Sequence, residues 1–301
     1  MVIYGQDVKK KNMFKIILIL EEEIFMKDYT KILPNHIEKY IGDNDLFLEI
    51  FDAEGDYEEI KKRPPIIFVH GAYTGSWMWS KYIPNFISKG WKCYVMNMRS
   101  HYKSRIMDFT KITFDDYLDD IKEVIAECDE KPILVGFSMG GILCQKIAET
   151  VDLHGLILID TCISKEVYQI SRYKENYKSS IERIIDPAPA RLESYSIDES
   201  EEDIAFQRKY LSMESSKVMS TILDYERSGG ISIDYSRIKC PSLVIKSVSS
   251  DDYNRRGKVL ADKLNATYEG LWNTTHTGLL IGQRYIEVVD IIIEWLNSYI
   301  L

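Results

Sequence analysis

The chain has 301 residues, 45% of them hydrophobic, which favours one large globular domain with an insertion over two independent folds. Its formal net charge of −9 argues against a nucleic-acid partner, because phosphate binding requires a basic surface. The five cysteines are scattered without metal-ligand spacing, so we expect buried thiols in a reducing, cytoplasmic environment rather than disulfides.

The N-terminal stretch contains several lysines and a short apolar run, Ile16–Leu20. Lys15 and the acidic residues at 21–23 bound this run, and no small-residue cleavage site follows, so we do not expect a signal peptide. The run is also too short to span a bilayer, and no transmembrane segment is predicted. We interpret residues 1–30 as an extension that packs as a helix or strand, with a membrane-surface or partner-binding element as the alternative.

Two strand-like runs open the domain. Residues 36–41 and 46–51 flank Gly42-Asp43-Asn44-Asp45, whose composition is typical of a turn, so we predict a β-hairpin. The continuous apolar run Ile66–Val69 then predicts a strand that is buried on both faces of a parallel sheet.

The loop after this strand is rich in glycine and aromatic residues: His70-Gly71-Ala72-Tyr73-Thr74-Gly75-Ser76-Trp77-Met78-Trp79. Gly71 and Gly75 allow the backbone to come close to a ligand. We interpret His70 as a structural histidine that holds the loop by hydrogen bonds. Tyr73 and Trp77 are candidates for the wall of a substrate pocket.

A further strand and a helix are predicted before residue 126. Residues 92–98 are predicted as a strand, and Thr113 and Asp116 form the S/T-x-x-D pattern that begins a helix. Apolar residues then recur at helical spacing on one face, at Phe114, Leu118, Ile121 and Ile125.

The most informative stretch is Lys131–Gly141, an apolar run that ends at a serine between glycines. A buried strand would turn sharply at Ser138 into a helix that begins near Met139, leaving the serine hydroxyl exposed at the carboxyl end of the strand. Gly136 and Gly140 would lie where side chains collide with neighbouring backbone. The pattern predicts a nucleophile elbow.

Through Gly136-Phe137-Ser138-Met139-Gly140-Gly141, the sequence resembles the α/β-hydrolase superfamily of serine hydrolases. The resemblance implies an α/β fold with a mostly parallel central sheet flanked by helices, and Ser138 as the nucleophile. The loop at 70–79 is most similar to the branch of methylesterases, hydroxynitrile lyases and bacterial esterases. By that match, the backbone N–H groups of Ala72 and Met139 would form the oxyanion hole.

The chain continues with a buried strand at 155–160, and its composition then changes. Tyr, Lys, Glu and Ser increase over residues 162–239, and no buried-strand run occurs there. By resemblance, this segment is a mostly helical cap inserted between two core strands, so the core comprises residues 31–161 and 240–301. We expect the cap to influence substrate choice more than acyl transfer.

The catalytic acid and base are expected after the serine. His276 is the one histidine that follows both Ser138 and the candidate acids, as the Ser, Asp, His order of this fold requires. Related sequences place the acid a few residues after the strand that begins near 241, which favours Asp251. Asp252 and Asp160 remain alternatives.

These residues together predict a serine hydrolase that cleaves a small or lipid-like carboxylic ester through an acyl-serine intermediate. The reaction needs neither a metal nor an organic cofactor, and the expected partner is a small-molecule ester or acyl substrate. The loop at 70–79 also leaves open a hydroxynitrile lyase or C–C hydrolase. A non-catalytic ligand receptor that retains the pocket is the alternative from another class.

Overall fold

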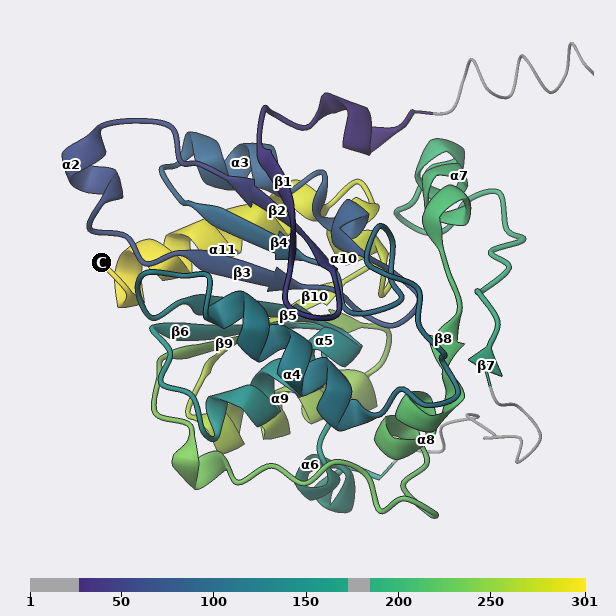
Figure 1. Cartoon of the computed structure of the whole chain (residues 1–301). Helices are drawn as coiled ribbons and strands as arrows, with labels where there is room; N and C mark the ends of the chain where they lie inside the picture. Colours follow the sequence, from purple (N-terminus) through teal and green to yellow (C-terminus); the bar gives the residue numbers. More distant parts are fainter. Residues whose placement is uncertain (1–26, 173–184) are drawn as a thin grey trace, which may run out of the picture.

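A mixed sheet of eight strands, in the order β1-β2-β4-β3-β5-β6-β9-β10, forms the centre of the protein (Figure 1). The computed structural model describes residues 27–172 and 185–301, so most of the expected N-terminal extension lies outside the described residues. The strands of this sheet are β1 (Ile37–Ile41), β2 (Leu46–Phe51), β3 (Ile66–Val69), β4 (Cys93–Met96), β5 (Ile133–Phe137), β6 (Gly155–Ile159), β9 (Ser242–Val248) and β10 (Thr267–Trp272).

The first two strands form the expected hairpin, in which Ile41 pairs with Leu46. The turn between them uses left-handed backbone at Gly42 and Asp45, with φ of 64° and 47°. Strand β2 pairs antiparallel with β4, and every later pair from β4 to β10 is parallel. The carboxyl ends of the parallel strands therefore meet at one edge, where sites form in open α/β sheets.

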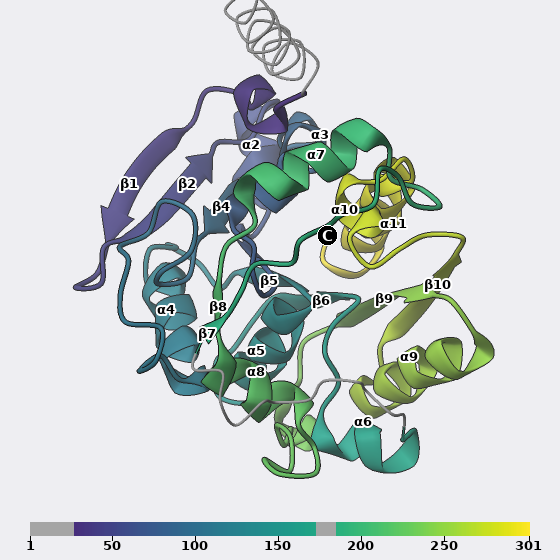
Figure 2. The same cartoon turned by 90° about the vertical axis from the view of Figure 1, so that its right-hand side faces the viewer.

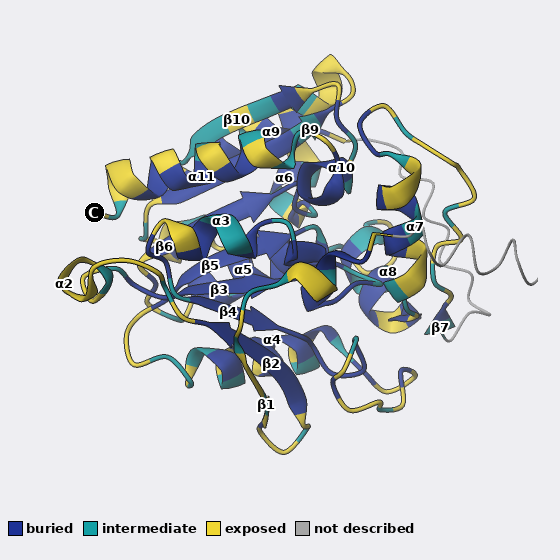
Figure 3. Ribbon diagram, turned by 90° about the horizontal axis from the view of Figure 1, so that it is seen from above, coloured by how far each residue is buried: buried dark blue, intermediate teal, exposed yellow. Residues whose placement is uncertain are grey.

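Helices cover both faces of the sheet (Figure 1). One face packs against α4 (Phe114–Ile125), α5 (Met139–Ala148) and α9 (Asp251–Leu264). The opposite face packs against α3 (Ile83–Ser88), α10 (Gly278–Ile281), α11 (Tyr285–Tyr299) and the 3₁₀ turn η2 (Ser76–Trp79). The inner strands are buried throughout, as their continuous apolar sequences predict (Figure 3).

Helices α4 and α11 show how capping and apolar spacing determine which side chains are buried. Helix α4 begins at Thr113, whose side chain forms the expected capping box with Asp116. In α11, Val289, Ile293 and Leu296 recur at helical spacing and are buried, but Ile286 at its start is 41% exposed. The neighbouring layer therefore covers this helix except in its first turn.

The segment between β6 and β9 crosses the edge at which the parallel strands end (Figure 2). Its elements are α6 (Lys165–Ile170), β7 (Ile185–Asp186), α7 (Glu201–Tyr210), β8 (Glu214–Ser215), α8 (Ser216–Leu223) and η3 (Tyr235–Arg237). Strands β7 and β8 pair only with each other, in a separate two-stranded sheet. We refer to residues 162–239 as the insertion.

Two short elements complete the described chain, η1 (Tyr29–Ile32) and α2 (Tyr57–Ile60). Tyr29 fixes η1 to the insertion, because its hydroxyl donates a hydrogen bond of 2.8 Å to Asp203 of α7. Among residues 27–172 and 185–301, no helix has both the length and the apolar character needed to cross a membrane.

Candidate active site

Ser138 lies at the junction of β5 and α5 in a backbone conformation that few non-glycine residues adopt, with φ of 53° and ψ of −117°. Its carbonyl oxygen accepts hydrogen bonds of 3.0 Å from the N–H groups of Gly141 and Cys162, and its own N–H donates to Ile159. These bonds hold the turn, because they connect the start of α5 to the end of β6. The side chain is left to face a pocket.

The glycines around Ser138 lie where other backbone comes close. A Cβ atom at Gly140 would lie 2.4 Å from the carbonyl oxygens of Val69 and His70, and one at Gly136 would lie 2.6 Å from the oxygen of Gly140. Neither contact is possible for a side chain, so both glycines are required for the strand and the helix to pack. The predicted geometry of the elbow is confirmed.

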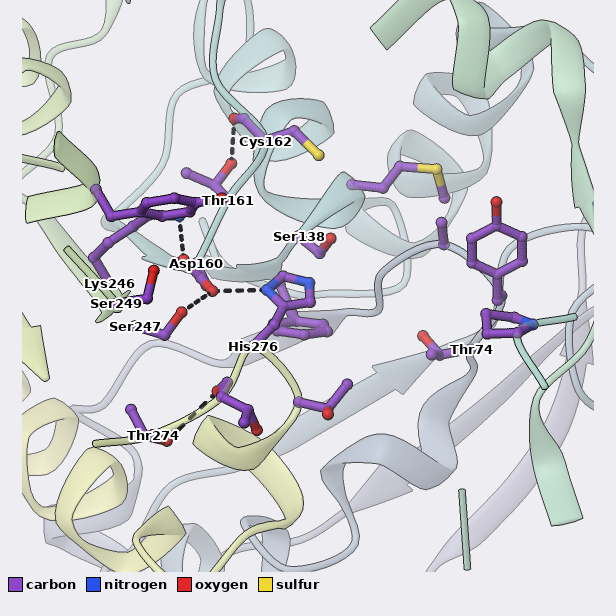
Figure 4. Close-up of a pocket in the computed structure, with 18 of the residues that line it drawn as sticks. Thr74, Ser138, Asp160, Thr161, Cys162, Lys246, Ser247, Ser249, Thr274 and His276 are labelled. Carbon is purple, nitrogen blue, oxygen red and sulfur yellow. Dashed lines mark hydrogen bonds and ion pairs between the residues drawn. The ribbon is translucent and has the colours of Figure 1, made fainter. Parts of the chain in front are cut away.

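His276 lies in the loop between β10 and α10, with its imidazole stacked on Phe137 at a ring distance of 4.5 Å. Its Nδ1 is 2.7 Å from Oδ2 of Asp160, the residue that follows β6. Figure 4 shows the imidazole between the Asp160 carboxylate and the Ser138 hydroxyl. The three side chains reach one place because β5, β6 and β10 all end at the same edge of the sheet.

Asp160 is 4% exposed and accepts hydrogen bonds from three side chains, those of His276, Lys246 and Ser247. Burial by itself would raise the pKa of this carboxyl group. The charges of Lys246 and His276, together with their hydrogen bonds, instead hold the pKa below its ordinary value. Asp160 is therefore ionised at neutral pH and favours an Nδ1–H tautomer on His276.

The expectation that Asp251 orients His276 is wrong. Strand β9 extends to Val248, and Ser250 caps the helix that follows, so Asp251 is the first residue of α9 and its side chain is exposed. Asp252 is exposed in the same turn. Asp160, the alternative at the end of the preceding strand, occupies the position beside His276.

A cavity of about 890 Å³ opens in front of these side chains. Ala72, Tyr73, Met139 and Trp272 belong to its core side, and Trp272 is 44% exposed. The insertion contributes an apolar wall that includes Pro189, Ile197, Leu211, Met219, Ile222 and Leu223. Core and insertion thus enclose one space, which is of the size that holds a small molecule.

Comparison with known proteins agrees with this architecture. The family model described as the alpha/beta hydrolase fold matches residues 64–179. Polyneuridine aldehyde esterase of Rauvolfia serpentina is 33% identical over 93 residues, which are 30% of this chain and 35% of that esterase. The chain therefore aligns with about a third of the length of this curated relative.

Solved structures share the fold over nearly the whole chain. A monoacylglycerol lipase of Paleococcus ferrophilus superposes with a TM-score of 0.63 at 20% identity, covering 84% of this chain and 99% of the lipase. A thermophilic esterase of Thermogutta terrifontis gives 0.60 at 16% identity, covering 89% and 100%. The chain has the α/β-hydrolase fold. The matches to the family model and to the esterase support a hydrolase as its general class.

Only one of the two predicted pocket residues lines the cavity. Tyr73 does so, whereas Trp77 is 1% exposed and packs against Phe206 and Tyr210 of α7. Trp77 belongs to the hydrophobic core because η2 turns its side chain away from the pocket and under α7. The prediction for Trp77 as a pocket residue is wrong.

His70 has the structural role that the sequence predicts. Its Nδ1 lies 2.8 Å from the carbonyl oxygen of Gly71, and its Nε2 accepts a hydrogen bond of 3.1 Å from the N–H of Met98. Complete burial and the neighbouring His101 hold the pKa of His70 well below its ordinary value. A neutral imidazole with both nitrogens occupied holds the loop and has no capacity left for proton transfer.

A buried ion pair that the sequence did not suggest connects the loop after β4 to the insertion. Nε2 of His101 lies 3.0 Å from Glu214 of β8, and both side chains are fully buried. Burial opposes the charge on His101, but Glu214 raises the pKa of the imidazole. The same carboxylate accepts a hydrogen bond of 2.6 Å from Tyr117 and one of 3.4 Å from the N–H of Tyr73. Glu214 therefore fixes the residue beside Ala72.

Two more carboxylates of the insertion contact the loop that carries His276. Asp198 accepts hydrogen bonds from Thr274 and Thr275, and Glu199 accepts from Thr275 and Thr277 at 2.8 and 2.7 Å. These threonines lie on both sides of His276 in the chain. The insertion thus supports the histidine loop in addition to covering the pocket.

Sequence reasoning missed Lys246, Asp198, Glu199 and Glu214. Lys246 had a usable signal, because a lysine inside the buried apolar strand β9 requires a partner of opposite charge. The three carboxylates had none, because they occur in a segment that is rich in acidic residues, where only the fold reveals which ones are buried.

Proposed function

We propose that the protein is a serine hydrolase that cleaves a carboxylic ester by acyl transfer through Ser138. The observation that carries this proposal is that the imidazole of His276 lies between the Asp160 carboxylate and the Ser138 hydroxyl at the edge of the pocket. Nδ1 of His276 is 2.7 Å from Asp160. In that arrangement, Asp160 orients the imidazole and leaves Nε2 to act on the serine.

In the first step, His276 Nε2 takes the hydroxyl proton of Ser138 while Oγ forms a bond to the carbonyl carbon of the ester. The tetrahedral intermediate then collapses, the ester C–O bond breaks, and the proton on Nε2 passes to the departing alcohol. Water then reacts with the acyl-serine in the same way. It gives a proton to His276 while its oxygen attacks the acyl carbon, and Ser138 recovers its proton as the carboxylic acid leaves.

The negative charge on the tetrahedral oxygen requires donors that are fixed in advance. The N–H of Met139 lies at the start of α5, where it has no partner within the helix and lies at the positive end of the helix dipole. Ala72 lines the same pocket from the opposite loop. We propose these two N–H groups as the oxyanion hole.

The apolar wall that the insertion adds to the cavity favours an ester with an apolar acyl or alcohol group. The similarity to polyneuridine aldehyde esterase and the fold shared with a monoacylglycerol lipase and an esterase are consistent with ester substrates. The cavity volume of about 890 Å³ accommodates a molecule larger than a minimal acetate ester.

A fluorophosphonate probe tests the proposal directly, because it forms a stable bond only with an activated serine. Wild-type protein should be labelled with a stoichiometry of one, and Ser138→Ala should not be labelled. Ser249→Ala is a matched control, because Ser249 lines the same pocket but lies outside the elbow, and this variant should be labelled as the wild type is. Labelling of Ser138→Ala, or no labelling of folded wild-type protein, would contradict the proposal. A series of p-nitrophenyl esters of increasing acyl length then measures the substrate preference.

A further inference from the structure

Lys246 is a charged side chain within the otherwise apolar strand β9 and is 9% exposed. Strands β6 and β9 run parallel with Ile159 opposite Ile245, so the next residue on each strand, Asp160 and Lys246, come side by side. The ammonium group donates a hydrogen bond to Oδ1 of Asp160. An unpaired buried lysine is costly, and this contact supplies the compensating charge.

The donors to Asp160 divide its two oxygen atoms between them. Lys246 binds Oδ1, whereas Ser247 and Nδ1 of His276 share Oδ2. The ammonium group therefore occupies the oxygen that the imidazole does not use (Figure 4). The three donors together hold the Asp160 carboxylate in a single orientation.

We propose that Lys246 is a positioning residue of the active site: its ammonium group fixes the carboxylate of Asp160 toward His276, offsets its negative charge, and thereby sets the pH range in which His276 acts as a base. This inference rests on the proposed function, because it assigns Lys246 a role in that reaction. Asp160 alone would stabilise the protonated, inactive imidazole, whereas the Asp160–Lys246 pair carries no net charge.

Other charged and titratable groups face this pair from each neighbouring element. Helix α9 contributes Tyr253, whose ring centre is 5.6 Å from Nζ of Lys246, and Arg256 packs over the same ring. Strand β10 contributes Tyr268, and burial together with the charge of Asp160 raises its pKa to about 12. Arg191 reaches the pocket from the insertion and is bound to Glu199. These groups are the same in the wild type and in variants at Lys246, so they do not account for a difference between those proteins.

The test compares Lys246→Met with Lys246→Arg in the pH dependence of kcat/KM for p-nitrophenyl acetate. Loss of the positive charge leaves Asp160 uncompensated, so the acid limb of the profile should move to higher pH in Lys246→Met. Lys246→Arg retains the charge and should keep the limb of the wild type.

Two further variants separate positioning from a general loss of structure. Ser247→Ala removes a neutral donor to Asp160 and should move the limb less than Lys246→Met does. Lys246→Gln is neutral but keeps a donor, and it replaces Lys246→Met in the comparison if the methionine variant does not fold. A neutral variant with the melting temperature of the wild type and an unmoved acid limb, or a limb at lower pH, overturns the role of Lys246. Fluorophosphonate labelling of Ser138→Ala would instead overturn the proposed function itself.

Discussion

The elbow at Ser138 and the insertion both determine the geometry of the site, but they do so by different means. The elbow depends on glycines within a few residues of the serine, where a Cβ at Gly140 would lie 2.4 Å from two carbonyl oxygens. The insertion acts through the buried carboxylates Asp198, Glu199 and Glu214, which contact loops between 76 and 141 residues away in the chain. The geometry of the elbow is therefore encoded by adjacent residues. The contacts of the insertion carboxylates depend on residues that only the folded chain brings together.

This difference changes what the insertion is expected to do. From the sequence, residues 162–239 were interpreted as a cap that influences substrate choice more than acyl transfer. The insertion carboxylates, however, hold the loops of Tyr73 and His276. Deleting the insertion should therefore impair acyl transfer even to a minimal ester, because both loops lose their buried partners.

The largest effect is expected at Asp160, which orients the imidazole of His276. Asp160→Asn keeps the shape but favours the wrong tautomer of His276, and turnover of p-nitrophenyl acetate should fall by roughly 10⁴-fold. Asp251→Asn is the matched control, because its side chain is exposed at the start of α9, and it should retain wild-type turnover. Steady-state kinetics of the two variants would contradict the assignment if Asp251→Asn were the impaired one.

Glu214→Gln tests the insertion through stability rather than turnover. The substitution breaks the buried pair with His101 and should lower the free energy of unfolding by about 3 kcal/mol or more. The His101 pKa is raised in the folded state, so the stabilisation is complete below its ordinary value of 6.5 and is lost as the pH rises through the folded value. The Glu214 pKa is lowered, so the stabilisation is lost again as the pH falls from the ordinary value of 4.5 through the folded value.

Denaturant unfolding of the wild type and Glu214→Gln between pH 4 and 9 provides the measurement. The difference between the two proteins should be largest between about pH 4.5 and 6.5 and should decrease at higher pH. A difference that stays constant over the whole range would show that His101 and Glu214 do not form an ion pair.

Gly140→Ala tests the elbow, again through the free energy of unfolding. The added methyl group meets the carbonyl oxygens of Val69 and His70, and overpacking of this kind should cost roughly 2–3 kcal/mol of unfolding free energy. Gly229→Ala is the control for backbone strain without crowding, because Gly229 has left-handed backbone, with φ of 76°, and no atom lies within 4 Å of the added group, whereas Gly140 lies in helix α5 without a positive φ. A loss in Gly140→Ala that is no larger than the loss in Gly229→Ala would show that close packing does not explain the need for Gly140.

The smallest effect is expected at the histidine loop. Glu199→Gln keeps the size of the side chain but weakens its bonds to Thr275 and Thr277, so kcat should fall by about tenfold with KM nearly unchanged. Glu193→Gln, at an exposed carboxylate of the same insertion, should leave kcat unchanged. An unchanged kcat in Glu199→Gln would show that the loop holds His276 without help from the insertion.

The sequence was sufficient wherever a short motif carries its own geometry. Ser138 with its glycines, the hairpin at 37–51 and the capping box at Thr113 were all recognisable from a few adjacent residues. The acid was misplaced because spacing along the chain favoured Asp251, whereas the parallel strand order β6-β9-β10 brings Asp160 at the end of β6 to His276 after β10. Trp77 was misplaced for a similar reason, since the helix that covers it comes from the insertion.

The exposure of Trp272 gives the protein an intrinsic optical reporter. The other tryptophans, Trp77, Trp79, Trp91 and Trp295, are at most 4% exposed, whereas Trp272 is 44% exposed and lines the pocket. A small aqueous quencher such as acrylamide therefore reaches one indole among the five in the chain. Fluorescence that becomes protected from quenching when a compound is added identifies that compound as an occupant of the cavity, with no chromogenic ester and no turnover required.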